Sequence, residues 1–292
     1  MDIQQLNDFF HEYADEQLIE SRRNGSAFAN DAYNLKAADG QRYVMRILKQ
    51  QLVETVQHEA DLQAKLAAAG ISTPQYLKFR SGSYVGEYDE HRFTISKHID
   101  GETPKSMPLR LVRSFGETLA KIHSCLSNSD VPPSKMQWLD PRNAEDDMAA
   151  YDGELKPRLA PLIAKYKEFF GLDMPKCLIH GDLWLGNVFA EGDQVTAVFD
   201  LETAEYTYRI LDLARTYLSA RRETELDPQQ LVDTLFEGYE SIAATPLTTE
   251  ERASFATAYQ YVAGVDALWN ALHDGVGRGA EVYIALGENP GI

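Results

Sequence analysis

Two short stretches carry the polar residues that decide how this sequence is interpreted: HGDLWLGN at positions 180–187 and FDLE at positions 199–202. Within them, Asp182, Asn187 and Asp200 each lie at the edge of a short apolar segment. The glycine and aspartate at 192–193 form a turn signal between the two stretches, which folds the second segment back beside the first. The sequence therefore predicts that Asn187 and Asp200 converge, with Asp182 nearby.

These three side chains have the chemistry to hold a metal ion and to accept a proton. Carboxylate and carboxamide oxygens are hard ligands that suit Mg²⁺, which takes its other ligands from water and from phosphates. A separate carboxylate beside that ion can align a hydroxyl and take its proton, which is the division of labour in phosphoryl transfer. We therefore predict that Asn187 and Asp200 are metal ligands and that Asp182 is the catalytic residue.

The spacing of the three residues resembles that of protein kinases, in which D-x4-N is followed by the aspartate of D-F-G. With His-Gly-Asp in the catalytic loop, the chain resembles the aminoglycoside phosphotransferase and choline kinase superfamily of small-molecule kinases, which includes fructosamine kinases and one type of homoserine kinase. The resemblance implies an α+β, two-lobe, protein-kinase-like fold. It places a nucleotide-binding, antiparallel β-rich lobe at residues 1–97 and a mainly helical lobe with the catalytic loop and acceptor site at 98–292.

The same resemblance assigns nucleotide-binding roles to residues of the first lobe. The expected strand at 42–48 places Val44 and Arg46 on one face, since side chains alternate along a strand. Val44 would cover the adenine and Arg46 would hold the phosphates, although the family usually has lysine at this place. Glu59 would pair with Arg46 and orient it. An exposed or merely structural ion pair, worth about 0–1 kcal/mol, is the alternative for these two residues.

Two further segments of the first lobe match family elements by their position. Gly25 and Ser26 lie in the loop that would cover the phosphates, where backbone N–H groups bind phosphate oxygens. Lys97 and Ile99 lie in the segment that would connect the lobes and bind adenine through main-chain groups. The resemblance therefore implies ATP and Mg²⁺ as cofactors and a phosphotransferase that acts on an alcohol group.

Hydrophobic periodicity supports the division into a β-rich and a helical part. Strands are expected at 17–21, 32–36, 42–48, 76–80 and 92–98, with an Asp-Gly hairpin turn at 39–40 and a helix at 53–69. Beyond residue 100, helices are expected around the apolar stripe from 112 to 126 and at 155–170, 209–222, 228–243 and 249–273, with a non-helical island at 177–201.

Several histidines, acids and aromatic residues near these stretches have structural alternatives. We expect His180 to brace the catalytic loop, His123 to be a hydrogen-bonded core residue, and Asp212 to support the loop from a helix. Trp184, Tyr206 and Tyr208 would either line an acceptor pocket or pack in the interior.

Composition excludes some classes of partner. The chain has 28 basic and 45 acidic residues, a net charge of −17, and so lacks the basic footprint of a nucleic-acid or anionic-membrane binder. Because the sequence shows no signal peptide, no apolar run of membrane-spanning length and only two cysteines, we expect a cytoplasmic protein. Residues 98–292 carry −14 of the charge, which favours a cationic small-molecule acceptor, with a solvated acidic surface as the alternative.

The acceptor and the competing functions stay open at this point. HGDLW is similar to fructosamine kinases, whereas NDAY at 30–33 and LAAAGISTP at 66–74 are similar to homoserine kinases; choline, ethanolamine and aminoglycosides are the other candidates. A metal-dependent hydrolase would need histidines at ligand spacing, and the seven histidines are scattered. The remaining alternative is a catalytically idle, kinase-like nucleotide-binding module, which usually lacks the base or a metal ligand.

Overall fold

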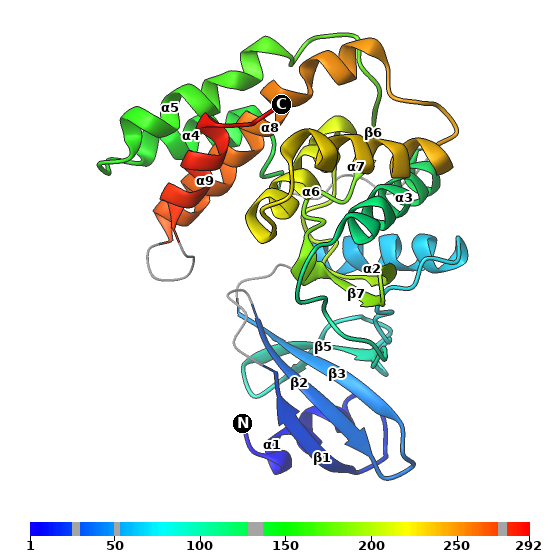
Figure 1. The fold of residues 1–292 in the computed structure, drawn as a ribbon. Helices are drawn as coiled ribbons and strands as arrows, with labels where there is room; N and C mark the ends of the chain where they lie inside the picture. The colour runs from blue at the N-terminus through cyan, green and yellow to red at the C-terminus, as the bar shows by residue number, and fades with distance from the viewer. Residues whose placement is uncertain (25–29, 50–52, 128–136, 274–278) are drawn as a thin grey trace. The chain divides into compact units, whose positions relative to one another are not determined.

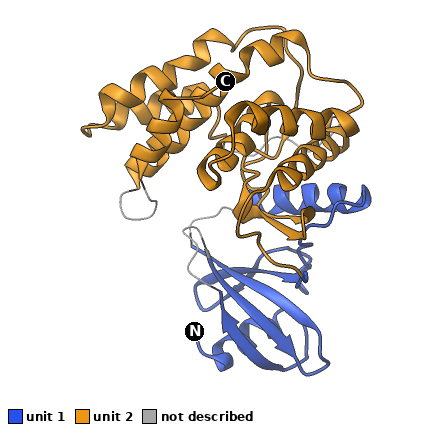
Figure 2. Ribbon diagram, viewed as in Figure 1, with its two compact units in different colours: residues 1–100 blue, residues 101–292 orange. Residues whose placement is uncertain are grey.

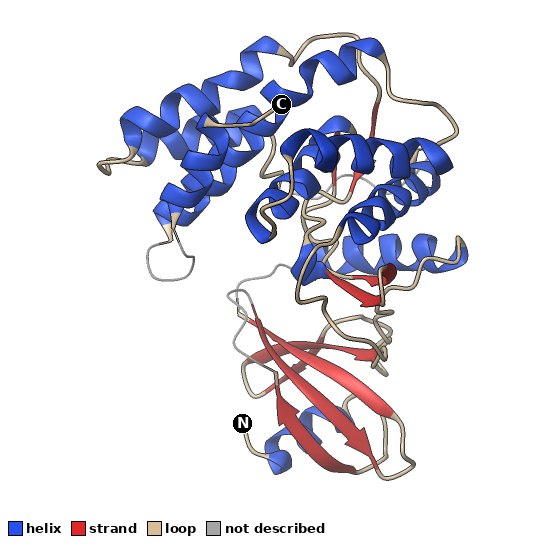
Figure 3. Cartoon of the chain, viewed as in Figure 1, coloured by secondary structure: helices blue, strands red, loops and turns tan. Residues whose placement is uncertain are grey.

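The computed structural model describes residues 1–24, 30–49, 53–127, 137–273 and 279–292. The chain divides into two compact units, which Figure 2 shows in different colours: Met1–Asp100 and Gly101–Ile292. Unit 1 is built on an antiparallel sheet and unit 2 is mainly helical, as the coloring of Figure 3 makes plain. The expected α+β class is therefore confirmed.

The sheet of unit 1 has the strand order β1-β2-β3-β5-β4, with every neighbouring pair antiparallel. Figure 1 labels its elements, which are α1 (Ile3–His11), β1 (Leu18–Arg23), β2 (Asn30–Ala37), β3 (Arg42–Leu48), α2 (Val53–Ala68), β4 (Gly86–Tyr88) and β5 (His91–Lys97). The Asp-Gly turn between β2 and β3 forms as expected, because Gly40 takes a left-handed φ of 86° that glycine adopts without strain.

One face of the sheet carries the main apolar core of unit 1. Alternate residues of β3, including Met45 and Ile47, pack there with Phe93 of β5 and with Phe9 and Phe10 of α1. The opposite face of β3 carries Val44 and Arg46, which are half-buried. The expected common face for these two residues is therefore present.

Two local predictions for unit 1 were wrong. Residues 76–80 do not form a strand, because the N–H of Tyr76 binds the Gln63 side chain and that of Phe79 binds Ser83 in a turn, which leaves a single β-bridge to Ser96. Strand β4 was missed. It is three residues long, and its hairpin turn uses Asp89 and Glu90 at positive φ instead of the usual asparagine and glycine.

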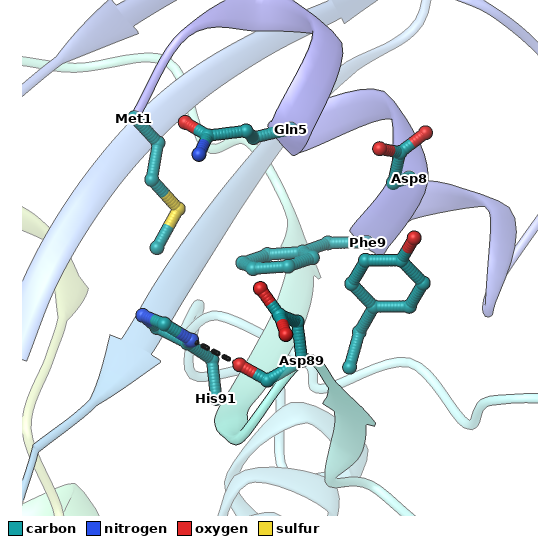
Figure 4. Close-up of a pocket in the computed structure, with 7 residues that line it drawn as sticks. Met1, Gln5, Asp8, Phe9, Asp89 and His91 are labelled. Carbon is teal, nitrogen blue, oxygen red and sulfur yellow. Dashed lines mark hydrogen bonds between the residues drawn. The ribbon is translucent and has the colours of Figure 1, made fainter.

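An open hollow of about 530 Å³ lies between α1 and the β4–β5 turn (Figure 4). Phe9, His91 and the acidic side chains of Asp8 and Asp89 are among the residues that line it. None of the predicted site residues lines this hollow.

Unit 2 contains a helical framework around two short pairs of strands. Its elements are α3 (Leu109–Leu126), α4 (Pro141–Ala150), α5 (Lys156–Ile163), the 3₁₀ helix η1 (Ala164–Glu168), β6 (Lys176–Ile179), the 3₁₀ helix η2 (Leu185–Asn187), β7 (Val188–Glu191), β8 (Gln194–Val198), β9 (Glu205–Tyr208), α6 (Ile210–Glu223), α7 (Pro228–Ile242), α8 (Thr249–Leu272) and α9 (Ala280–Glu288). Strands β7 and β8 form a hairpin and β6 pairs with β9, both antiparallel.

The helices of unit 2 pack closely against one another. Helices α3 and α7 approach at Gly116 and Gly238, where an added Cβ would lie 2.3 and 2.2 Å from backbone oxygens of the facing helix. The expected apolar stripe of α3 is fully buried. Helix α8 packs against α5, α6 and α9, so it forms the centre of the second half of the unit.

Helix prediction in unit 2 missed two elements and overextended one. The expected helix at 155–170 is α5 followed by the tighter η1, with Pro161 inside α5. Helix α4 was missed because it buries only Ala144 and Met148, which gives no apolar stripe. The short α9 was also missed. No helix in the described part of the chain combines the length and apolar character needed to cross a membrane.

Candidate active site

The loop between β6 and β7 brings the predicted catalytic and metal-binding residues together. The side-chain amide of Asn187 donates hydrogen bonds to the backbone oxygen of Asp182 at 2.9 Å and to its Oδ2 at 3.0 Å. The N–H of Phe199 donates to the backbone oxygen of Asn187 at 2.9 Å, and this bond places Asp200 beside the loop. The expected convergence of these residues therefore occurs within unit 2.

An arginine holds the other oxygen of the Asp182 carboxylate. Arg215 of α6 donates from Nε and Nη2 to Asp182 Oδ1 at 3.0 and 2.8 Å. Burial raises the pKa of Asp182 to about 7; Arg215 opposes that shift, and the carboxylates of Asp200 and Asp266 add to it. The side chain keeps 20% of its surface exposed, so the carboxylate remains open to a reactant.

Helix α6 anchors the backbone of the catalytic loop. Asp212 accepts hydrogen bonds from the N–H groups of His180 and Gly181 at 2.8 and 2.9 Å, and His123 Nε2 lies 2.9 Å from its Oδ2. Burial disfavours the charge on Asp212, but these hydrogen bonds outweigh it and hold the pKa of Asp212 below its ordinary value. His123 also contacts the hydroxyl of Tyr239 at 3.0 Å, so it is a hydrogen-bonded core residue, as expected.

The fully buried His180 connects the catalytic loop to the segment that bears Asp200. Its Nε2 lies 2.9 Å from the backbone oxygen of Phe199, and its Nδ1 accepts from the N–H of Asp182 at 3.3 Å. These partners require a neutral ring with the proton on Nε2. Burial lowers the pKa of His180, in agreement with that state. Gly181 next to it has a left-handed φ of 83°, and an added Cβ would lie 2.7 Å from Thr203 O.

The environment of Asp200 fits a bound cation. Among the residues that the structure describes, Asp200 Oδ1 is buried and has no hydrogen-bond partner, and the residue takes an uncommon φ of +65°. Because Asn187 donates its amide hydrogens to Asp182, its carbonyl oxygen is left as an acceptor. Two hard oxygen ligands suit a magnesium ion, whose remaining coordination positions are filled by phosphates and water. No group of three or more histidine, cysteine, aspartate or glutamate side chains is placed to hold a metal in the described ranges.

Unit 1 brings Arg46 and Glu59 together through a tyrosine. Arg46 Nη1 lies 3.5 Å from Glu59 Oε1 and donates to the hydroxyl of Tyr76 at 2.6 Å. Tyr76 in turn donates to Glu59 Oε2 at 2.7 Å, and Glu59 is 1% exposed. The expected ion pair is therefore present, with Tyr76 as a third member that sequence reasoning missed.

The other predicted residues lie at several places in the two units. Lys97 ends β5 opposite Tyr43, and Ile99 is half-buried in the segment that follows. Gly25 and Ser26 lie outside the described residues. Of the aromatic candidates, Tyr208 is 1% exposed and belongs to the core. The two others are Tyr206, which is 59% exposed, and Trp184, which stacks with Arg222 at 5.3 Å.

We expect Tyr76→Phe to lower the free energy of unfolding by about 1–3 kcal/mol, because the change removes one hydrogen-bond partner from the buried Glu59 and one from Arg46. The change is measured by unfolding the protein in urea and monitoring hydrogen exchange at the amides of unit 1. Tyr84→Phe is the matched control, since that ring packs against the apolar cluster to which Tyr76 itself belongs. Equal stability of the two variants would contradict a supporting role for Tyr76.

A buried acid beneath the catalytic loop gives unit 2 a pH-dependent stability. Glu205 of β9 pairs with Ile179 and accepts from the N–H of Leu139 at 3.0 Å, and burial raises its pKa to about 8. Between its ordinary pKa of 4.5 and about 8, the unfolded chain releases this proton while the folded chain keeps it. The contribution of Glu205 to stability is therefore lost as the pH rises through this window.

We expect Glu205→Gln to remove this loss of stability. At pH 8 the free energy of unfolding of the variant should exceed that of the unmodified protein by about 2–4 kcal/mol, and the difference should vanish near pH 4.5. Glutamine keeps the acceptor for Leu139 while it cannot ionise. Unfolding by urea at pH 5, 6, 7 and 8 tests this. Parallel pH profiles for the two proteins would show that Glu205 does not titrate as expected.

Residues 20–255 match the sequence model of the phosphotransferase enzyme family. The chain belongs to this family. Two similar proteins are named homoserine kinase. That of Methylobacillus flagellatus is 24% identical over 87% of this chain and 79% of its own length. That of Zymomonas mobilis is 26% identical over 86% of this chain and 81% of its own length. The expected family and enzyme class, a small-molecule kinase that phosphorylates an alcohol group, are confirmed.

Solved structures confirm the kinase-like fold of this phosphotransferase. An amicoumacin kinase in complex with AMP-PNP, Ca²⁺ and its antibiotic matches with a TM-score of 0.77 at 12% identity, over 100% of this chain and 93% of that one. A macrolide 2′-phosphotransferase from Brachybacterium faecium matches with a TM-score of 0.67 at 18% identity, over 99% and 98%. At these identities the likeness establishes the fold.

Sequence reasoning missed Arg215, which contacts the predicted catalytic residue Asp182. Arg215 lies three residues after Asp212, so the two side chains share a face of α6. That spacing could have indicated that Arg215 lies close to the loop that Asp212 supports. The contact between Arg215 and Asp266 gave none, because Asp266 lies on α8, 51 residues further along the chain.

Proposed function

We propose that this protein transfers the γ-phosphoryl group of ATP, with Mg²⁺, to a hydroxyl of a small, amine-bearing metabolite, and that a hydroxy amino acid of the homoserine type is the first acceptor to test. The observation that carries the proposal is that the loop bearing Asp182 and Asn187 lies beside the segment bearing Asp200, whose Oδ1 has no hydrogen-bond partner among the described residues. The relatives named homoserine kinase support the acceptor class.

The residues of unit 2 carry the reacting atoms in this proposal. Asp182 orients the acceptor hydroxyl and takes its proton while the hydroxyl oxygen bonds to the γ-phosphorus and the bond to the bridging oxygen of ADP breaks. Asn187 and Asp200 hold the Mg²⁺. The ion, when bound, neutralises charge on the phosphates. His180 and Asp212 keep the loop in the conformation that presents Asp182.

The residues of unit 1 bind the nucleotide in this proposal. Arg46, braced by Glu59 and Tyr76, contacts the phosphates that are not transferred; its planar guanidinium offers several donors where lysine would offer a point charge. Val44 and Ile99 contact the adenine together with the backbone at Lys97. We keep the assignment of the phosphate-covering loop to Gly25 and Ser26.

The charge distribution supports an acceptor with an amine. Residues 98–292 carry most of the net charge of −17, so a cationic acceptor is attracted to the unit that holds Asp182. Choline, ethanolamine, aminoglycosides and glycated amines are cations at neutral pH. Homoserine carries an ammonium group and a carboxylate, so the acidic unit attracts its amine end but the molecule has no net charge. Homoserine is supported by the names of the similar proteins.

A turnover screen tests the proposed function. ADP formation is measured with Mg²⁺-ATP or Mg²⁺-GTP and each acceptor class in turn, with EDTA and the Asp182→Asn variant as controls. We expect ADP formation that depends on one amine-bearing acceptor and disappears with EDTA. Tight nucleotide binding without acceptor-dependent turnover would overturn the proposal and favour a catalytically idle nucleotide-binding module.

A further inference from the structure

We propose that Arg215 is a positioning residue for the catalytic carboxylate and that Asp266 is the counter-charge that keeps Arg215 in place. The inference rests on the proposed function, because it needs Asp182 as the group that meets the acceptor. It adds two residues, on α6 and α8, to the set that determines the turnover rate. Neither residue is part of the predicted loop or of the predicted metal site.

Both oxygens of the Asp182 carboxylate are held by neighbouring side chains. Arg215 binds Oδ1 with two of its nitrogens, and Asn187 binds Oδ2 with its amide. A carboxylate held at one oxygen can still rotate about its last single bond, whereas one held at both oxygens cannot. Arg215 therefore fixes the plane of the carboxylate and the direction of the lone pairs that remain for the acceptor hydroxyl.

Asp266 lies on the far side of Arg215 from Asp182. Its Oδ2 lies 3.5 Å from Arg215 Nη1, on the side of the guanidinium that does not face Asp182. Both side chains are deeply buried, and a buried guanidinium is stable only with compensating charge. Asp266 supplies that charge from α8, which packs against α6, so the contact between these two helices sets where Arg215 points.

The three side chains differ in how deeply they are buried. The exposed fraction increases from 4% at Asp266 to 8% at Arg215 and to 20% at Asp182. The cluster thus extends from the interior toward the surface, and the carboxylate at its exposed end is the one assigned to the acceptor. Replacing a buried ion cluster with apolar residues often leaves stability unchanged or improves it, so fold stability alone gives little reason for this cluster.

The experiment combines four variants with the kinetics of the full-length protein. We expect Arg215→Ala and Arg215→Lys to lower kcat about a hundredfold with little change in KM for ATP, because a misplacement of about 1 Å has an effect of this size. Lysine keeps the charge but cannot bind Oδ1 through two nitrogens. Asp266→Asn should lower kcat about tenfold or more. Arg221→Ala is the control: this arginine of α6 binds Tyr217 and the backbone oxygen of Pro290, and its loss should leave kcat unchanged.

Two further measurements separate positioning from a general structural role. In an Asp182→Asn background, Arg215→Ala should have no additional effect, since it acts through that carboxylate. Added guanidinium ion should restore part of the kcat of Arg215→Ala without changing its KM. Independent effects of the two substitutions, or wild-type kcat in Arg215→Lys, would overturn the inference.

A readout without turnover keeps the inference falsifiable if a variant is poorly active or unstable. In a crystal structure of Arg215→Lys, the Asp182 carboxylate should leave the plane in which Asn187 and Arg215 hold it, and an unchanged carboxylate would overturn the inference. If Asp182→Asn is fully active, the proposed function itself is wrong. If Asp182→Asn is inactive and Arg215→Ala is fully active, only the positioning role is wrong.

Discussion

Asp182→Asn is expected to lower kcat by about a thousandfold while the affinity for Mg²⁺-ATP changes less than about threefold, since general base catalysis contributes about 10²–10⁴ to rate. Asparagine has nearly the same shape but cannot accept the proton of the acceptor hydroxyl. It also presents an NH₂ group to one of the two donors, Arg215 or Asn187, that now bind carboxylate oxygens. Steady-state kinetics and calorimetric titration with nucleotide measure the two quantities separately.

The control for this substitution is Asp193→Asn, the same chemical change on the β7–β8 turn of the same unit. That protein should retain wild-type kcat. A fully active Asp182→Asn protein would remove Asp182 from its proposed role. Equal loss of activity in both variants would point to a general sensitivity of the unit and would also contradict the assignment.

Asp200→Asn is expected to abolish the effect of magnesium on nucleotide binding. Asparagine keeps the size of the side chain and tolerates the positive φ of this position better than alanine, so the substitution removes the charge while it preserves the backbone. Changes in residues that merely contact metal ligands weaken metal binding about 10- to 100-fold. Loss of a carboxylate ligand should do at least as much.

Titrations with ATP in the presence of Mg²⁺ and in the presence of EDTA test the role of Asp200. The unmodified protein should bind nucleotide more tightly with the metal, and the variant should bind equally in both conditions. Thermal unfolding of the variant checks that the loop remains intact. An undiminished response to Mg²⁺ in Asp200→Asn would show that this carboxylate does not hold the ion.

The sequence predicted those parts of the fold in which local chemistry and periodicity agree. The strand at 42–48, the Asp-Gly turn and the apolar stripe of α3 were all found, because each has its own pattern. Residues 76–80 have the sequence pattern of a strand. Their N–H groups instead bind the Gln63 side chain and a turn, and these contacts depend on the tertiary structure. The strand β4 is short, and its turn residues Asp89 and Glu90 are unusual at positive φ.

The residues of the candidate site also divide into those with a local sequence signal and those without one. The spacing of Asp182, Asn187 and Asp200 predicted that they lie close together, and one hairpin and one loop do bring them together. Tyr76 and Asp266 could not be found, since each reaches its partner across more than one element and has no motif of its own. Long-range polar contacts of this kind depend on helix packing, which a single sequence does not reveal.

The anchoring of the catalytic loop by Asp212 has a consequence for genetics. The chain of hydrogen bonds from the loop through Asp212 and His123 reaches Tyr239 on α7. A random-mutagenesis screen for inactive clones should therefore return substitutions at His123 and Tyr239. Neither residue is among those proposed to contact the substrates. Such alleles should be temperature-sensitive, because they destabilise the loop without altering the reacting groups, and a destabilised loop loses its conformation on heating first.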